Sequence, residues 1–225
     1  MTHHVHGTAS EEAATMTPVD LENLNDLQLD ALREIGNIGA GTAASSLSQM
    51  TGQPIAMAVP RVSILPVEEI PARIGGEEQI VVAVYLQVMG DAPGHIVFLS
   101  PAETAHEVCH QLMGGMPSGD EVRFGFSEME LSALQEIGNI MTGSYLRALA
   151  ELTGMHLEPS PPALGVDMAA ALLGSVLAEV ARNSGAALLI ETAFEEHDLP
   201  SFGHFVYIPE PASLLVVLRS LGLAS

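Results

Sequence analysis

Two short segments of the chain carry the same pair of side chains, a carboxylate followed three residues later by an amide. The pairs are Glu34 with Asn37 and Glu136 with Asn139. Residues three or four apart lie on one face of a helix. An amide can hold a water molecule in a chosen orientation, and a carboxylate can pair with a lysine or accept a proton. Because phosphoryl transfer needs mainly positioning and charge neutralisation, each pair would suit hydrolysis of a phosphate presented by another molecule.

The alternative is an ordinary solvated face of an amphipathic helix. Comparison of the two segments argues against it. A flanking polar position has changed from Arg33 to Gln135, whereas the acid and the amide are the same in both copies. Glycines within the first segment weaken a helix by roughly 1 kcal/mol each relative to alanine. These glycines, Gly36, Gly39 and Gly41, indicate either close helix packing or room for the backbone of a partner.

The two segments belong to an internal repeat with an offset of 102 residues. Residues 30–60 align without a gap with residues 132–162. Each copy is preceded by a capping box, which begins a helix. The two boxes are Asn25 with Gln28 and Ser127 with Glu130. Because glycine is a common helix stop, we expect one long helix in each half, ending at Gly52 and at Gly154.

Strand-like segments follow each expected helix. They lie near 55–64, 79–88 and 94–99 in the first half, and near 157–167, 186–194 and 202–208 in the second. The turns between neighbouring strands are short, which favours antiparallel pairing. The second half has about seven extra residues, in a longer helix near 169–182. The pattern predicts an α+β fold, a pseudo-twofold tandem repeat with about six mostly antiparallel strands, helices packed on the sheet and motif helices that expose Glu and Asn.

The chain is predicted to form one domain, 20–225, made of two repeats of about 20–118 and 122–225, after a disordered tail at 1–19. All 7 basic residues are arginine, and the formal net charge is −21. Such a surface repels nucleic acid and anionic membranes and suits a partner with a basic face. We see no signal peptide and no apolar run of the ~18 residues that a membrane span needs. With a single cysteine, the default location is the cytoplasm.

The spacing Asp/Ser-x3-Glu-x2-Asn-x22-Pro resembles the signature of the CheC/CheX/FliY family of chemotaxis phosphatases. Both halves fit it, over roughly residues 20–225. The matching residues are Asp30, Glu34, Asn37 and Pro60, and then Ser132, Glu136, Asn139 and Pro162. Within that family, two copies in one chain are typical of the CheC type.

The resemblance implies hydrolysis of the aspartyl-phosphate of a CheY-like response regulator. Asn37 and Asn139 would orient the attacking water, and Glu34 and Glu136 would pair with a lysine of the regulator. Mg²⁺ would come with the regulator, so no cofactor or metal of the chain's own is expected. The remaining motif residues would be supporting: Asp30, Ser132, Pro60 and Pro162. The deamidase CheD is a further implied partner, and a non-catalytic module that binds phosphorylated CheY or CheD is the alternative function.

A competing motif lies in the helix expected after Pro101. The segment 106–110 matches H-E-x-x-H, the pattern of zinc peptidases, with His106 and His110 as ligands. The equivalent helix of the second half has no such residues, so an ordinary packing helix is favoured. Cys109 is expected to be a buried apolar residue rather than an activated thiolate. Three histidines in the expected tail could bind metal weakly: His3, His4 and His6.

Overall fold

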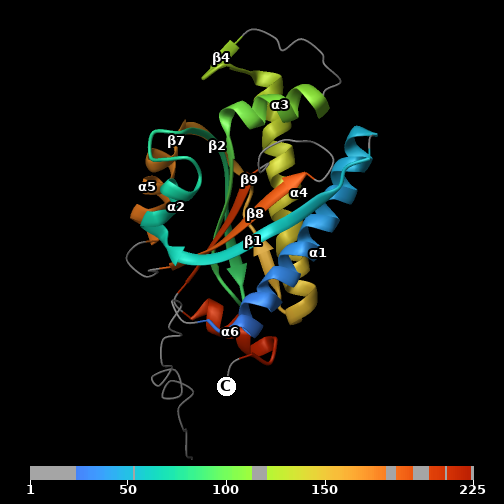
Figure 1. Cartoon of the computed structure of the whole chain (residues 1–225), viewed down its shortest axis with the longest axis vertical. Coiled ribbons are helices and arrows are strands. Elements are labelled where there is room, and N and C mark those ends of the chain that lie inside the picture. The colour runs from blue at the N-terminus through green and yellow to red at the C-terminus, as the bar shows by residue number, and fades with distance from the viewer. Residues whose placement is uncertain are drawn as a thin grey trace, which may run out of the picture.

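The computed structural model describes residues 24–52, 54–112, 121–180, 186–194, 203–210 and 212–223. The predicted disordered tail and its three histidines lie outside these ranges. Within them, the chain forms an antiparallel sheet with helices on both faces (Figure 1). None of the described helices is long and apolar enough to cross a membrane.

The two motif helices begin and end where the sequence predicted. They are α1 (Asp26–Thr51) and α4 (Glu128–Thr153), each of 26 residues. At the start of α1, the Asn25 side chain accepts a hydrogen bond from the backbone N–H of Gln28. The Gln28 side chain in turn accepts one from the backbone N–H of Asn25. The same box forms in α4 between Ser127 and Glu130. Both helices end in a glycine with φ of 69°, a left-handed conformation that glycine adopts without steric cost.

The main sheet has seven antiparallel strands, in the order β1-β8-β9-β3-β2-β6, with β7 also paired to β2. The prediction of an α+β fold with antiparallel strands is therefore confirmed. The strands are β1 (Met57–Pro66), β2 (Ile80–Gly90), β3 (Gly94–Pro101), β6 (Leu157–Pro159), β7 (Ala163–Met168), β8 (Ala186–Phe194) and β9 (Gly203–Pro209).

The seventh strand arises because the segment predicted as one strand, 157–167, is divided in two. Pro161 and Pro162 have no N–H to donate to the ladder. The segment between β6 and β7 therefore has one residue more than the part of β2 that it faces. Within this segment Ser160 bonds to Gln87 of β2: its hydroxyl accepts from the Gln87 N–H, and its own N–H donates to the Gln87 carbonyl. A register shift also occurs in β1 between Ala58 and Arg61, the position of Pro60. Both motif prolines thus coincide with an irregularity in a strand.

The two repeats exchange their first strands. Strand β1 of the first repeat pairs with β8 of the second, and β6 and β7 of the second pair with β2 of the first. The repeats meet at the centre of the sheet, where β3 pairs with β9. Because each outer strand is held by the other repeat, neither half carries its own complete sheet.

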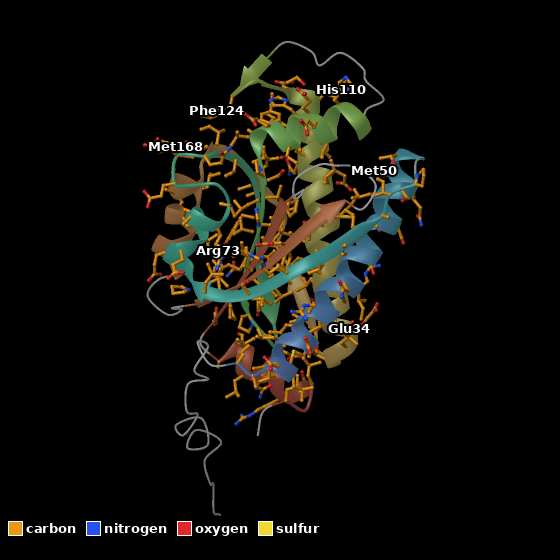
Figure 2. The ribbon with its side chains drawn as sticks, in the orientation of Figure 1. Glu34, Met50, Arg73, His110, Phe124 and Met168 are labelled. Atoms are coloured by element: carbon orange, nitrogen blue, oxygen red, sulfur yellow. The ribbon has the colours of Figure 1, made fainter. Side chains whose placement is uncertain are left out.

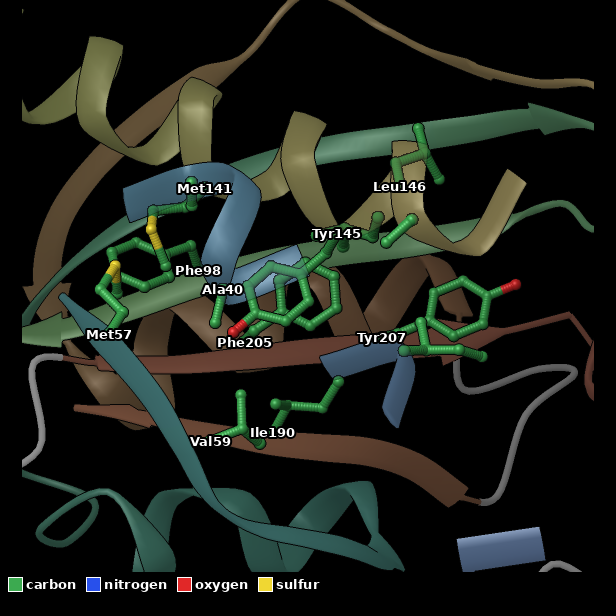
Figure 3. Packing of buried hydrophobic residues seen from close by; sticks show 14 of the residues in the cluster. Ala40, Met57, Val59, Phe98, Met141, Tyr145, Leu146, Ile190, Phe205 and Tyr207 are labelled. Carbon is green, nitrogen blue, oxygen red and sulfur yellow. The ribbon is translucent and has the colours of Figure 1, made fainter. Parts of the chain in front are cut away.

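The long helices α1 and α4 cover one face of the sheet over the largest apolar cluster. In this cluster the ring of Tyr145 stacks on Phe205 with 4.4 Å between ring centroids (Figure 3). The other face carries the shorter helices α2 (Ile70–Arg73) and α5 (Ala169–Val180) over a second cluster. The extra residues predicted in the second half account for the greater length of α5.

The remaining described elements are two helices, a 3-10 turn and a short hairpin. Helices α3 (Ala102–Leu112) and α6 (Ser213–Ser220) follow β3 and β9 as predicted, and a short 3-10 turn spans Val67–Glu69. The junction between the two repeats includes a hairpin that the sequence did not predict. There β4 (Glu121–Arg123) and β5 (Phe126–Ser127) form a hairpin. Its turn residues, Phe124 and Gly125, both have positive φ, as a tight hairpin turn requires.

Candidate functional site

The acid and amide side chains lie on the outer faces of the two motif helices. Glu34, Asn37 and Glu136 are exposed, and Asn139 is half-buried. Figure 2 shows Glu34 on the side of α1 that is turned away from the sheet. Within the part of the chain that the structure describes, none of the four side chains forms a hydrogen bond or an ion pair. Their hydrogen-bonding groups are therefore available to a partner molecule.

The glycine between acid and amide brings each motif helix close to the sheet. A Cβ atom on Gly36 would lie 3.3 Å from a methyl group of Val59 in β1, and one on Gly138 would lie 2.4 Å from a methyl group of Val84 in β2. Gly39 has the same role between the helices, because its Cβ would lie 2.9 Å from the Cα of Tyr145 in α4. Close packing thus explains three glycines of the repeated segments.

The two sites are separate. Helices α1 and α4 run in opposite directions (Figure 1), and Gly39 is level with Tyr145. At a rise of 1.5 Å per residue, Asn37 and Asn139 are therefore about 12 Å apart along the helix direction. Each site consists of residues from one helix, so each could act without the other.

The residues predicted to be supporting have different surroundings in the two copies. The Asp30 carboxylate pairs with Arg33 at 2.8 Å in an exposed ion pair, whereas the Ser132 hydroxyl donates to the Glu128 carbonyl at 2.9 Å. Pro162 lies beside its motif helix, since its carbonyl accepts a 3.4 Å hydrogen bond from the Gln135 amide. Asp30 and Ser132 are thus close to the acid and amide along the helix but engaged with their own neighbours.

The H-E-x-x-H segment in α3 is held by packing contacts. The His106 ring stacks on Phe126 with 3.7 Å between centroids, and its Nδ1 lies 3.4 Å from the buried Glu130 carboxylate of the α4 capping box. Burial, and next the negative charge of Glu130, raise the pKa of the Cys109 thiol to about 12. Cys109 is therefore a thiol rather than a nucleophilic thiolate at neutral pH, and it packs in the core as predicted.

Two residues near the motif escaped the sequence analysis. Leu27 is 66% exposed and Met129 is 60% exposed, each in the first turn of its motif helix. They are equivalent at the repeat offset of 102, and each lies three residues before the supporting position. The sequence does contain a signal, since an apolar side chain recurs at this position on the polar face of both copies, but the two residue types differ.

The two motif glycines should respond differently to alanine. Gly138→Ala is expected to lower the free energy of unfolding by about 1–3 kcal/mol, because the added methyl group overlaps Val84. Gly36→Ala should be near neutral, since its closest contact of 3.3 Å can relax and alanine gains up to about 1 kcal/mol in helix propensity. Urea unfolding of both variants measures the difference, and equal losses would contradict the packing described here.

Comparisons with known proteins agree with this arrangement. The model of the CheC-like family matches twice, at residues 27–64 and 129–166, which cover both motif helices and the strands after them. The CheY-P phosphatase CheC of Bacillus subtilis is 34% identical over 201 residues, covering 88% of this chain and 96% of that protein. The putative CheY-P phosphatase CheC1 of Halobacterium salinarum is 33% identical over 138 residues, covering 61% of this chain and 68% of that one.

Among solved structures, Thermotoga maritima FliY has the same fold. It superposes with a TM-score of 0.66 at 23% identity, covering 90% of this chain and 99% of that one. The B. subtilis alignment spans most of both chains at 34% identity and includes both copies of the motif. On that ground, the protein belongs to the CheC-like family.

Proposed function

We propose that the chain hydrolyses the aspartyl-phosphate of a CheY-like response regulator. The observation that carries this proposal is the duplicated pair of Glu and Asn side chains on the outer faces of two helices, where only Asn139 is half-buried and none of the four side chains has a partner among the described residues. The names of the B. subtilis and H. salinarum relatives, CheY-P phosphatases, support the same substrate. We also place the chain in the cytoplasm, the default for a chain with a single cysteine.

In the proposed mechanism, the chain supplies positioning and the regulator supplies the phosphate. The side-chain amide of Asn37 or Asn139 accepts a hydrogen bond from a water molecule and so orients that water in line with the phosphorus atom. The water oxygen attacks phosphorus, the bond between phosphorus and the aspartyl oxygen breaks, and the electron pair stays on the regulator's carboxylate. The products are that carboxylate and dihydrogen phosphate, which retains both protons of the water.

Glu34 and Glu136 dock the helix in this proposal. Each is an exposed carboxylate one helical turn before its amide, so a lysine at the regulator's active site can pair with it while the amide reaches the phosphate. The net charge of −21 favours a partner that presents basic groups at its surface. Mg²⁺ belongs to the regulator's active site in this scheme, and a CheD-type deamidase stays a predicted second partner.

A catalytic assay tests the proposal against a binding module. The chain is mixed with Mg²⁺ and a hundredfold excess of phosphorylated regulator. Phosphate release should continue until all of the regulator is dephosphorylated. A module that only sequesters the regulator would leave almost all of it phosphorylated. As a control for the metal, chain that is treated with chelator and then desalted should be fully active, because the proposal places the essential Mg²⁺ in the regulator. Absence of turnover would contradict the proposed activity.

A further inference from the structure

The outer face of each motif helix carries two features besides the acid and the amide. Ten residues before the amide stands an exposed apolar residue, Leu27 or Met129, and four residues after it stands a glycine, Gly41 or Gly143. Steps of three, four and seven residues keep all these positions on one helix face. We refer to this face, from the apolar residue to the glycine, as the docking strip.

The fold does not explain the apolar ends of the docking strips. Single exposed leucines are common on protein surfaces. Here, however, exposures of 66% and 60% occur at equivalent positions of the two repeats, on the helix face that carries the acid and the amide. Leu27 and Met129 are both long, flexible apolar side chains, and each stands next to an acidic first turn. A repeated apolar side chain on a polar face indicates a contact made outside the chain.

The fold does not explain the glycine ends either. A Cβ atom added at Gly41 or Gly143 would meet nothing within 4 Å, unlike those at Gly36, Gly39 and Gly138. Alanine at these two positions would stabilise the helix, since glycine weakens a helix interior. Of the two causes that the sequence left open, close packing within the chain is therefore excluded here. The remaining cause is room for the backbone of another molecule.

We propose that the docking strips are the contact surface for the regulator domain, with Leu27 and Met129 as apolar anchors and Gly41 and Gly143 as sites of backbone approach. The inference rests on the proposed function, because the same molecule must bring its phosphate to the amide between the two ends. From Leu27 to Gly41 the strip is about 21 Å long at 1.5 Å per residue. A standard interface covers about 800 Å² on each partner, so a strip of this length would be one part of such an interface.

The glycine ends give a test in which stability and function change in opposite directions. The double variant G41A/G143A should raise Tm by roughly 4–8 °C, from two gains in helix propensity. It should raise KM for the phosphorylated regulator about 10-fold, because two methyl groups now hold the partner's backbone away. Gly174→Ala is the matched control. Gly174 is exposed within α5 with open space around it, so its replacement should raise Tm and leave KM unchanged.

The apolar ends are tested with L27A/M129A, which should raise KM roughly 10-fold with little change in kcat or Tm, since little buried surface is lost. Met168→Ala is its control, because Met168 is 44% exposed at the end of β7, away from both motif helices. Direct titration with regulator carrying a stable phosphate mimic measures the same contact without hydrolysis. Unchanged affinity in both double variants would overturn the docking strips, whereas a chain that binds but never turns over would overturn only the proposed activity.

Discussion

Replacing both motif amides, in Asn37→Ala with Asn139→Ala, is expected to reduce kcat for the phosphorylated regulator by roughly 100-fold or more. In the proposed mechanism the amide orients the attacking water, and loss of a positioning group of this kind costs about that factor. The remaining Glu34 and Glu136 should still dock the regulator, so KM should change little. Single-turnover decay of phosphorylated regulator at saturating chain concentration measures the chemical step directly.

The single variants report how the two sites share the activity. Each motif helix carries a complete pair, so Asn37→Ala and Asn139→Ala should each retain the rate of the other site. Asn139 is half-buried and Asn37 is exposed, so the two contributions need not be equal. Gln49→Ala is the control, because it removes an exposed amide from α1 outside the motif. If the double variant kept the rate of the unaltered chain, neither amide could have the proposed role in orienting the water.

Local signals predicted the motif helices well. The capping boxes at Asn25 and Ser127 and the stops at Gly52 and Gly154 are each decided by neighbours in sequence, and the structure has all four. Strand pairing is different, because it joins residues far apart in the chain. Nothing local distinguishes pairing of β1 within its own repeat from pairing with β8, so the exchange of outer strands could not be predicted.

The sequence predicted which residues form the candidate site, but it predicted the packing around them only in part. Spacing placed Glu34 and Asn37 on one helix face, and the structure has both exposed there. The sequence could not say which glycines pack and which are open. Gly36 and Gly41 look alike in the sequence, yet only Gly36 approaches the sheet. That difference depends on where β1 and β8 lie, which in turn depends on the exchanged pairing.

The exchange predicts that neither repeat folds alone. The fragments 20–118 and 122–225, expressed separately, are expected to show no cooperative unfolding as monomers, whereas their equimolar mixture should recover the structure. Without the second repeat, β1 loses β8, and α1 loses the packing of Gly39 against Tyr145. The apolar cluster under α1 and α4 draws residues from both halves, so each fragment alone would expose that surface and an unpaired strand edge to water.

Thermal melts followed by circular dichroism, together with size-exclusion chromatography, measure this outcome. The control is the whole chain cut at an engineered protease site between 118 and 122, which should stay folded as one particle. Because the repeats are alike, a fragment could also pair with a second copy of itself, and its Tm would then rise with concentration. A fragment that is monomeric and melts cooperatively at a Tm independent of concentration would show that one repeat can complete its own sheet. The exchanged pairing would then be a consequence of linking the repeats, and not a requirement for folding either of them.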